Sequence, residues 1–519
     1  MTEAKLAANW AHSTFLKTLP NEIVSIIFFM ALEDVRHTSL LKRQYIRQSQ
    51  EPRQNRLLIA HLLSSVCKKW RHIAVSLPRL WADIDVFLHR QHGDDALSIF
   101  RNIIKRSKNA PLTIRLYFEP EDGNTYSYST ITMNQLQPAL TILQEESERW
   151  QSLKMSVPLK IISDLLRPRM NLSGVRSLYV QSGNQDFHDI GLVSPAENNG
   201  LQPRHVSFDN LTMKNIDIIW NRVTYISARH FTTLQAMKVV RSAPLLTHLK
   251  LKSVDEHPDP ALSTYLPDFI HSNLRHIMYE GVDCSVGGAK TIFSFNIFPA
   301  LTRVEFYNRA AYTGPGADQD TLTCNILRHS PPLKEMKLYI SRPYRPHYLM
   351  SVLEAVSPTL TLLEFGPLDG YYRSWSVCNY TPLFKRFATV DDHQKFLPCL
   401  KGLIFSSTKL FERWDLVPKF FASHDQQRQR PLKQFIFFII PTAANNLSGD
   451  DIFVPKKVLY QLGRLQRSGF HVHYRSRNRA GTNLLQESIK FHNLSRVASQ
   501  TEAQAAQLAA PINIPASVS

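Results

Sequence analysis

Only a few short residue patterns in this sequence could carry catalytic or metal chemistry. His471 and His473 are two residues apart, a spacing that places both rings on one face of a strand, where they could bind a metal ion. A stable metal site needs further ligands, and no third ligand residue is near them in the sequence, so we predict two surface histidines. Gly287, Gly288 and Lys290 lack the spacing of a loop that cradles phosphate.

The other signatures of catalysis do not occur in the sequence. It contains no nucleotide-binding glycine motif, no serine-hydrolase motif and no zinc-protease motif. The carboxylates of Glu145 and Glu146, and those of Asp391 and Asp392, are adjacent in sequence, and solvated helix ends or loops explain them. We therefore predict that the chain is not an enzyme and has no catalytic residue, no metal site and no cofactor.

Composition predicts a folded chain inside the cell. The 519 residues are 43 % apolar and 20 % charged, which is enough to bury a core, and no apolar run approaches the length of a membrane span. The first 18 residues lack the continuous apolar stretch of a secretory signal, so we expect a cytoplasmic or nuclear location and no membrane partner. The five cysteines are scattered, and we expect reduced thiols.

The net charge of +18 raises the question of a polyanionic partner, because Lys and Arg neutralise phosphates. Residues 409–480 hold 13 Lys and Arg against 5 Asp and Glu, but these charges are spread singly among apolar residues. That distribution favours a solvated basic face, or an acidic protein partner, over nucleic acid.

The elements that would position any binding residue come from a repeat. A six-residue pattern with apolar residues at its first, fourth and sixth positions recurs seven times between Leu246 and Phe437, at intervals of 27 to 40 residues. Five copies have proline two positions upstream, where it ends a helix and opens an extended segment, and looser copies lie near residues 150, 175 and 203. Apolar periodicity predicts helices over 321–329 and 348–356. Such strand–turn–helix units must stack to bury their apolar strand faces.

Over about residues 150–440 this pattern resembles the leucine-rich-repeat family, in an irregular form. The resemblance implies a β/α solenoid with a parallel sheet on its concave face. Residues at the third and fifth positions of each copy, and the residue just after it, alternate with the buried ones and face outward. This face runs from basic early repeats to apolar late ones, and a merely solvated strand face is the alternative to a binding surface. The candidate substrate-binding residues are His248, Lys250, Lys252, His276, Arg303, Tyr307, Lys337 and Tyr339.

The N-terminal 90 residues read as short helices. One begins at Pro20 and has Ile23, Ile26, Ile27 and Met30 on one side. After a polar insert at about 35–56, residues 57–63 and 65–74 continue the helical pattern. Because three short helices cannot bury this much aliphatic surface within about 70 residues, we expect a partner protein to cover it.

Three blocks in this region, Leu19-Pro-x-Glu-Ile, Val66-Cys-Lys-x-Trp-Arg and Pro78-x-Leu-Trp, resemble the F-box in its expanded fungal type. The resemblance covers about residues 19–86. It implies docking to a Skp-type adaptor and, through it, to a cullin ubiquitin ligase. Leu80 and Trp81 are expected to pack the module onto the repeats. Carried over by position, the adaptor-binding residues are Leu19, Pro20, Ile23, Ile27, Val66, Cys67 and Trp70.

Together these observations predict an α/β chain with a helical F-box-like module followed by a leucine-rich-repeat-like β/α solenoid. The expected divisions are an N-terminal segment at 1–14, the module at 15–90, the solenoid at 91–480 and a disordered tail at 481–519. The favoured function is the substrate-recognition subunit of a Skp-cullin-F-box ubiquitin ligase, with an unknown protein substrate that is acidic or phosphorylated. The alternative is a structural or nucleic-acid-interacting repeat protein whose N-terminal helices only cap the array.

Overall fold

A computed structural model of the chain provides the structure. It describes residues 19–32, 56–88, 94–118, 133–158, 161–162, 165, 171–181, 201–209, 211, 218–254, 269–281, 296–308, 333–340, 346–356, 358–367, 380–389, 396–407, 410–421, 431–440, 452–476 and 483–493. Contacts between residues divide the chain into two units: the first comprises residues 1–231 and 238–246, and the second residues 232–237 and 247–519.

Fourteen strands form a large sheet in which strand order follows chain order, and the strand pairs align in parallel. Parallel neighbours need a crossover connection between them, which the strand–turn–helix unit supplies. The structure therefore confirms the prediction of a mixed α/β chain with a parallel sheet. Two short strands, β8 (Phe269–Ile270) and β10 (Asn296–Ile297), pair separately.

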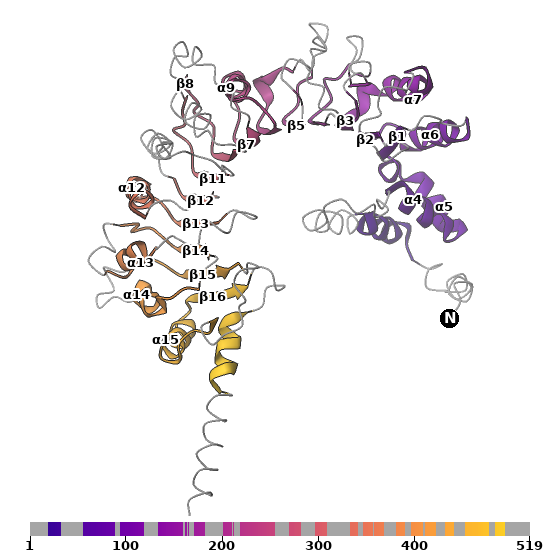
Figure 1. Cartoon of the computed structure of the whole chain (residues 1–519). Helices are drawn as coiled ribbons and strands as arrows, with labels where there is room; N and C mark the ends of the chain where they lie inside the picture. The colour runs from indigo at the N-terminus through magenta and orange to yellow at the C-terminus, as the bar shows by residue number, and fades with distance from the viewer. Residues whose placement is uncertain are drawn as a thin grey trace, which may run out of the picture. The chain divides into compact units, whose positions relative to one another are not determined.

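The first unit joins a helical module to six strands. The module consists of a helix over residues 21–32, α4 (Arg56–Ser65), α5 (Lys68–Ser76) and the 3-10 helix η1 (Pro78–Leu80). Helices α6 (Asp94–Ser107) and α7 (Met133–Glu145) lie on one side of the strands that they follow (Figure 1). The strands are β1 (Asp83–Leu88), β2 (Leu112–Phe118), β3 (Trp150–Ser156), β4 (Ser177–Gln181), β5 (His205–Asp209) and β6 (Tyr225–Arg229).

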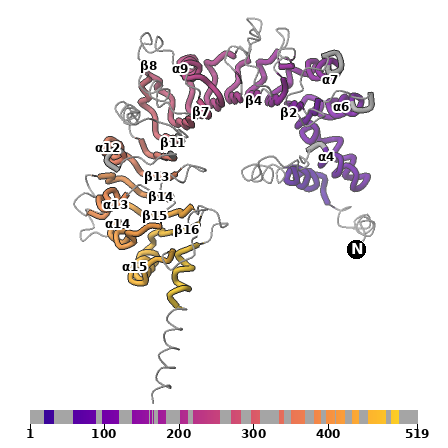
Figure 2. The backbone as a smooth tube through the Cα atoms, in the orientation of Figure 1, coloured from indigo at the N-terminus to yellow at the C-terminus, as the bar shows by residue number. Residues whose placement is uncertain are grey.

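The second unit contains eight further strands of the same sheet. Its strands are β7 (His248–Val254), β9 (His276–Gly281), β11 (Arg303–Asn308), β12 (Glu335–Ile340), β13 (Leu362–Pro367), β14 (Gly402–Ser407), β15 (Gln434–Ile439) and β16 (His471–Ser476). Helices α12 (Pro346–Val356), α13 (Thr381–Ala388), α14 (Val417–Phe421) and α15 (Lys456–Arg467) all lie on one side of these strands (Figures 1 and 2). Helix α9 (Thr233–Ser242) contributes residues to both units.

The core of the second unit lies between the strands and these helices. The rings of Phe365, Phe405, Phe437 and Tyr474 follow one another across β13 to β16, with centroids 4.7, 5.5 and 5.3 Å apart. The apolar residues at the fourth and sixth motif positions are buried, as Leu249 and Leu251 are on β7, whereas His248 at the third position is exposed. The third and fifth motif positions are less buried on most strands, although Glu305 at a fifth position is buried.

Two predicted boundaries need correction. The expectation that a disordered tail begins at residue 481 is wrong for residues 484–493, which form a helix. The ring of Phe491 in that helix lies 4.2 Å from the ring of Phe453, and the amide of Val454 donates a hydrogen bond to Ser488 Oγ at 3.1 Å. The module predicted at 15–90 is also not a separate unit, because its last segment is β1 of the sheet.

Several other predictions fall partly or wholly outside the described residues. These are the segment 1–14, the helix at 321–329, nearly all of the polar insert and the tail from residue 494 onward. The helix predicted at 348–356 is confirmed as part of α12. Cys67 and Cys399, the two cysteines that the structure describes, are free thiols.

Candidate protein-interaction surfaces

The helical module folds around one aromatic contact. Phe28, on the buried side of helix 21–32, packs edge-on against Trp70 of α5, with ring centroids 5.0 Å apart. Lys69 Nζ donates a hydrogen bond to the carbonyl of Leu19 at 2.6 Å, which holds the start of that helix against α5. Val24 and Leu32 complete the buried side, so the helix presents its other side to solvent.

That other side is strongly apolar. Exposure ranges from 37 % for Ile27 to 64 % for Met30, values at which a monomeric protein would ordinarily carry polar residues. The residues that share this exposure, here called the apolar helix surface, are Ile23, Ile26, Ile27, Met30, Leu58, Leu62 and Val66. Such a surface can bind the apolar face of another protein, at about 1.5–3 kcal/mol for each large side chain fully buried.

The predicted adaptor-binding residues occupy different positions in the module. Pro20, Ile23, Ile27 and Val66 are exposed, whereas Leu19 and Cys67 are half-buried. The Sγ atom of Cys67 accepts a hydrogen bond from the amide of Trp70 at 3.4 Å and so caps α5.

Trp70 is only 5 % exposed, which makes it a support for the apolar helix surface rather than a part of it. The adaptor-binding residues predicted from the sequence do not include Leu58 and Leu62, although their spacing of four residues places them on one helix face.

Leu80 and Trp81 join the module to the rest of the first unit. Both are buried, and the indole Nε1 of Trp81 donates a hydrogen bond to the carbonyl of Ala74 at 2.7 Å. On its other side, the guanidinium carbon of Arg106 in α6 lies 4.5 Å from the Trp81 ring centroid. These contacts agree with the role expected of both residues.

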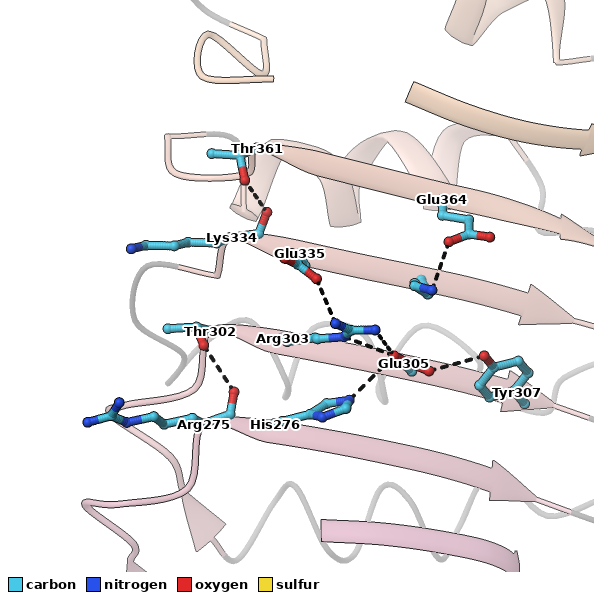
Figure 3. A network of polar contacts seen from close by, with 11 residues as sticks. Arg275, His276, Thr302, Arg303, Glu305, Tyr307, Lys334, Glu335, Thr361 and Glu364 are labelled. Atoms are coloured by element: carbon cyan, nitrogen blue, oxygen red, sulfur yellow. Dashed lines mark hydrogen bonds and ion pairs between the residues drawn. The ribbon is translucent and has the colours of Figure 1, made fainter. Parts of the chain in front are cut away.

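The strand face of the second unit carries a network of paired charges (Figure 3). Arg303 Nε donates to Glu305 Oε1 at 2.9 Å, and Arg303 Nη1 lies 3.1 Å from Glu335 Oε2 on β12. One strand further, Lys337 Nζ lies 3.0 Å from Glu364 Oε2. His276 Nε2 approaches Glu305 Oε1 to 3.4 Å, which brings residues from four strands into one network.

Two tyrosines complete the network. The hydroxyl of Tyr307 donates to Glu305 Oε2 at 3.1 Å, and the hydroxyl of Tyr339 donates to Glu364. Their rings stack, with centroids 5.3 Å apart. Among the candidate substrate-binding residues, His276, Arg303, Tyr307, Lys337 and Tyr339 therefore belong to one internal cluster.

The remaining candidates, His248, Lys250 and Lys252, lie on the neighbouring strand β7. His248 is exposed and its ring lies 5.5 Å from that of His276, edge to face. Lys250 is half-buried opposite Met278, and Lys252 is half-buried opposite Glu280. These three residues therefore stand beside the paired network and are accessible from the same face.

The prediction that this early strand face is basic is wrong. The outward positions of β7 to β13 hold as many carboxylates as cations: Lys250, Lys252, Arg303 and Lys337 against Glu280, Glu305, Glu335 and Glu364. Glu305 lies on the same strand as Arg303, whereas Glu335 and Glu364 lie on the strand next to Arg303 and Lys337 respectively, so that only the sheet register brings these two pairs together.

The network shifts the protonation of its members. The contact with His276, followed by the effects of Arg303 and Lys337, lowers the pKa of Glu305 to about 2, although burial opposes this shift. Burial, followed by the charge of Glu305, raises the pKa of Tyr307. At neutral pH the carboxylate is therefore charged and the phenol is neutral, which suits a fixed donor–acceptor pair.

A hollow of about 280 Å³ lies on the strand face of the first unit. Small residues from adjacent strands, among them Ser152 and Ser177, form its floor, and Lys154 Nζ lies 4.6 Å from the ring centroid of Tyr179 at its side. Sequence reasoning missed this hollow because it applied the outward positions of the motif only from residue 246 onward. The looser copies near residues 150, 175 and 203 carry the same signal.

The described residues include the pair His471 and His473 and the helices that bear on a membrane span. The rings of His471 and His473 lie 6.4 Å apart on β16, and within those ranges no group of three or more His, Cys, Asp or Glu could hold a metal ion. No helix in the same ranges is both long enough and apolar enough to cross a bilayer.

The sequence matches no protein-family model and no curated protein. The resemblances to the F-box and to leucine-rich repeats therefore depend on the residues and on the geometry described above.

Proposed function

We propose that this chain is the substrate-recognition subunit of a Skp-cullin-F-box ubiquitin ligase. In this proposal the helical module docks a Skp-type adaptor and the repeats hold a target protein. The chain then needs no catalytic residues of its own, because it contributes proximity between the target and the ubiquitin donor.

The observation that carries the proposal is the apolar helix surface. Ile23, Ile26, Ile27 and Met30 lie on the helix that the first F-box-like block opens, and Val66 belongs to the second block, while Leu58 and Leu62 lie on α4 between these blocks. All of them remain exposed after the module has formed its own core around Phe28 and Trp70. A helical cap that only closes the end of a sheet would turn its apolar side toward that sheet. An exposed apolar side on a folded module instead favours a second protein as its cover.

Co-expression with a Skp-type adaptor tests the proposal. The wild-type chain should co-purify with the adaptor in equal amounts. Replacing Ile23 with Asp places a charge in the buried interface and removes apolar contact, so the affinity should fall more than tenfold. Because Ile23 is 43 % exposed, the folded module should tolerate the change.

Ile99→Asp is the matched control, because Ile99 is 55 % exposed on α6 of the same unit but lies outside the module. It should leave adaptor binding unchanged. Equal adaptor capture by the Ile23→Asp and wild-type chains would contradict the proposal, and equal loss from both variants would point to general apolar adhesion.

A further inference from the structure

A row of basic residues crosses the second unit at the N-terminal ends of its successive strands, here called the edge. The residue immediately before each strand of the large sheet from β7 to β15, at the second position of the motif, is never acidic, and Phe470 holds this place before β16. In chain order these residues are Thr247, Arg275, Thr302, Lys334, Thr361, Lys401 and Lys433. The four cations among them, Arg275, Lys334, Lys401 and Lys433, are here called the basic edge row.

The backbone fixes this row in a line. The carbonyl of Arg275 accepts hydrogen bonds from the amides of Thr302 and Arg303 at 2.9 and 3.0 Å. The same arrangement recurs from each repeat to the next, with the carbonyls of Lys334 and Lys401 as acceptors. The backbone position of each row residue is therefore set by hydrogen bonds to the neighbouring repeat and not by flexible loops.

The threonines of the row have a structural role that the cations lack. Thr302 Oγ1 donates to the carbonyl of Arg275 at 3.2 Å, and Thr361 Oγ1 donates to that of Lys334 at 2.9 Å (Figure 3). Figure 3 also shows the side chains of Arg275 and Lys334 extending away from the network around Glu305. Long cationic side chains at these positions add nothing to the hydrogen bonds that hold the edge together.

The positive charge of the row is uncompensated. All four side chains are exposed, and none of them forms an ion pair with another described residue. Arg303 and Lys337, on the adjacent strand face, are each paired with glutamate. The repeat thus places its free positive charge at the edge and neutralises the charge on its face.

The first unit repeats this pattern independently. Arg176 and Arg204 immediately precede β4 and β5, and both are exposed. Thr224 precedes β6, and its Oγ1 donates to the carbonyl of Arg204 at 3.2 Å. The recurrence argues that the basic second position is a property of the repeat and not an accident of one segment.

We infer that the basic edge row binds an extended acidic segment of a partner protein. Adjacent strands lie about 4.8 Å apart, so the row spans about 24 Å from β9 to β15, with cations at intervals of about 10, 10 and 5 Å. An extended chain rises about 3.3 Å per residue, so roughly seven residues with several carboxylates cover this length. The inference rests on the proposed function only in identifying that partner as a ligase target.

Nucleic acid is a poorer complement to this row than an acidic peptide. Proteins that bind single strands combine positive charge with aromatic side chains on which bases stack. The one aromatic residue at these positions in the second unit, Phe470 before β16, is half-buried and packs on Phe421 with ring centroids 5.0 Å apart. Tight backbone binding to a duplex uses many phosphate contacts, whereas the row offers a single file of four cations.

Two charge-matched variants of the full-length chain test the inference without any adaptor. The first replaces Arg275, Lys334, Lys401 and Lys433 with Gln. The second replaces four exposed cations of α15, Lys456, Lys457, Arg464 and Arg467, with Gln, so that both variants lose the same net charge within one unit. The probes are fluorescein-labelled deca-glutamate, deca-glutamine and a twenty-nucleotide thymidine strand, with binding measured by fluorescence anisotropy at 50 and 150 mM salt.

Wild-type chain should bind deca-glutamate, more weakly at 150 mM salt, and should not bind deca-glutamine. The edge variant should lose at least about tenfold in affinity, since four exposed ion pairs each worth a few-fold are removed, and the α15 variant should lose less than about threefold. Equal losses in both variants would show that net charge alone acts and would overturn the inference. Tighter wild-type binding to the thymidine strand, lost in the edge variant, would overturn it in favour of nucleic acid.

Retained adaptor capture by the edge variant would show that it is folded. If the edge variant bound deca-glutamate as tightly as wild type, the peptide-binding inference would fail while the adaptor-binding proposal would still stand. Failure of adaptor capture would leave the peptide binding of the isolated chain in place, so the two proposals can fail separately.

Discussion

Glu305 is the residue on which the paired network of the second unit converges. His276, Arg303 and Tyr307 all contact its carboxylate, and these contacts lower its pKa to about 2. A carboxyl whose pKa is lower in the folded than in the unfolded chain stabilises the fold when it is ionised. That stabilisation is complete above the ordinary glutamate pKa of about 4.5 and disappears as the pH falls toward 2.

The Glu305→Gln change should therefore destabilise the chain in a pH-dependent manner. At pH 7 we expect a loss of about 2 kcal/mol in the free energy of unfolding, because a partly buried charged acceptor is removed from Arg303 and Tyr307. At pH 3 the difference from wild type should be smaller. Urea unfolding of both proteins at the two pH values measures this.

Glu354→Gln is the control for that measurement. Glu354 pairs with Arg386 at the surface with its side chain 50 % exposed, so its loss should change stability by less than about 1 kcal/mol. If Glu305→Gln behaved like this control at pH 7, the network would be only a surface arrangement of charges.

Residue-scale features of the sites were only partly predictable. Motif positions placed His276, Arg303 and Lys337 on one face, because alternation along a strand has a period of two. The partners of these residues did not follow from the sequence, because Glu335 and Glu364 depend on how many residues each connection holds and hence on sheet register. The same limitation concealed the edge row, which emerges only when the second positions of successive repeats are aligned.

Two glycines show how closely the elements of the second unit approach each other. A Cβ atom on Gly366, at the end of β13, would lie 2.6 Å from the Cβ atom of Ser406 and 3.1 Å from its carbonyl oxygen on β14. A Cβ atom on Gly463, inside α15, would have no neighbouring atom within 4 Å. The first glycine is required by packing, whereas the second only adds flexibility to a helix.

Opposite effects of alanine at these two positions follow. Gly366→Ala should destabilise the chain by about 1–3 kcal/mol, because β13 and β14 must separate or shift. Gly463→Ala should stabilise it by up to about 1 kcal/mol, the difference in helix propensity. Chemical denaturation of both variants measures the two signs, and a neutral Gly366→Ala variant would show that the strands adjust freely at this point.

Elements with a strong motif could be predicted, and those with a weak one could not. The seven full copies of the apolar pattern all become strands, and the proline that precedes most of them correctly marks where the extended segment opens. Strand β6 was missed because Ala228 stands where other copies have a large side chain, although it is fully buried. The helix at 484–493 was missed because composition was averaged over a tail whose later residues are poor in apolar side chains.

At the scale of the whole molecule, net charge is a poor guide to partners. The chain carries +18, yet in the second unit the cations of the strand face are balanced by glutamates. Among the described residues, the exposed cations before the strands and on α15 are spread along lines rather than concentrated in a patch. Long-range attraction to duplex nucleic acid should therefore be weak.

We accordingly expect weak binding of the full chain to nonspecific duplex DNA. No more than about two phosphate contacts should form, which corresponds to a loss of roughly tenfold in affinity between 50 and 200 mM salt. A titration of labelled duplex at both salt concentrations measures this. A loss of a thousandfold or more would instead favour the nucleic-acid-interacting alternative.

The agreement between strand order and chain order affects how such a protein can change during evolution. His248, His276 and Arg303 occupy equivalent places on neighbouring strands of the sheet. Excision of residues 276–302 would remove one strand with its connection and bring Arg303 into the place of His276, directly after Arg275. The interior would still receive Val304 in place of Ile277. Recombination within the gene can thus lengthen or shorten the strand array while the helical module stays unaltered.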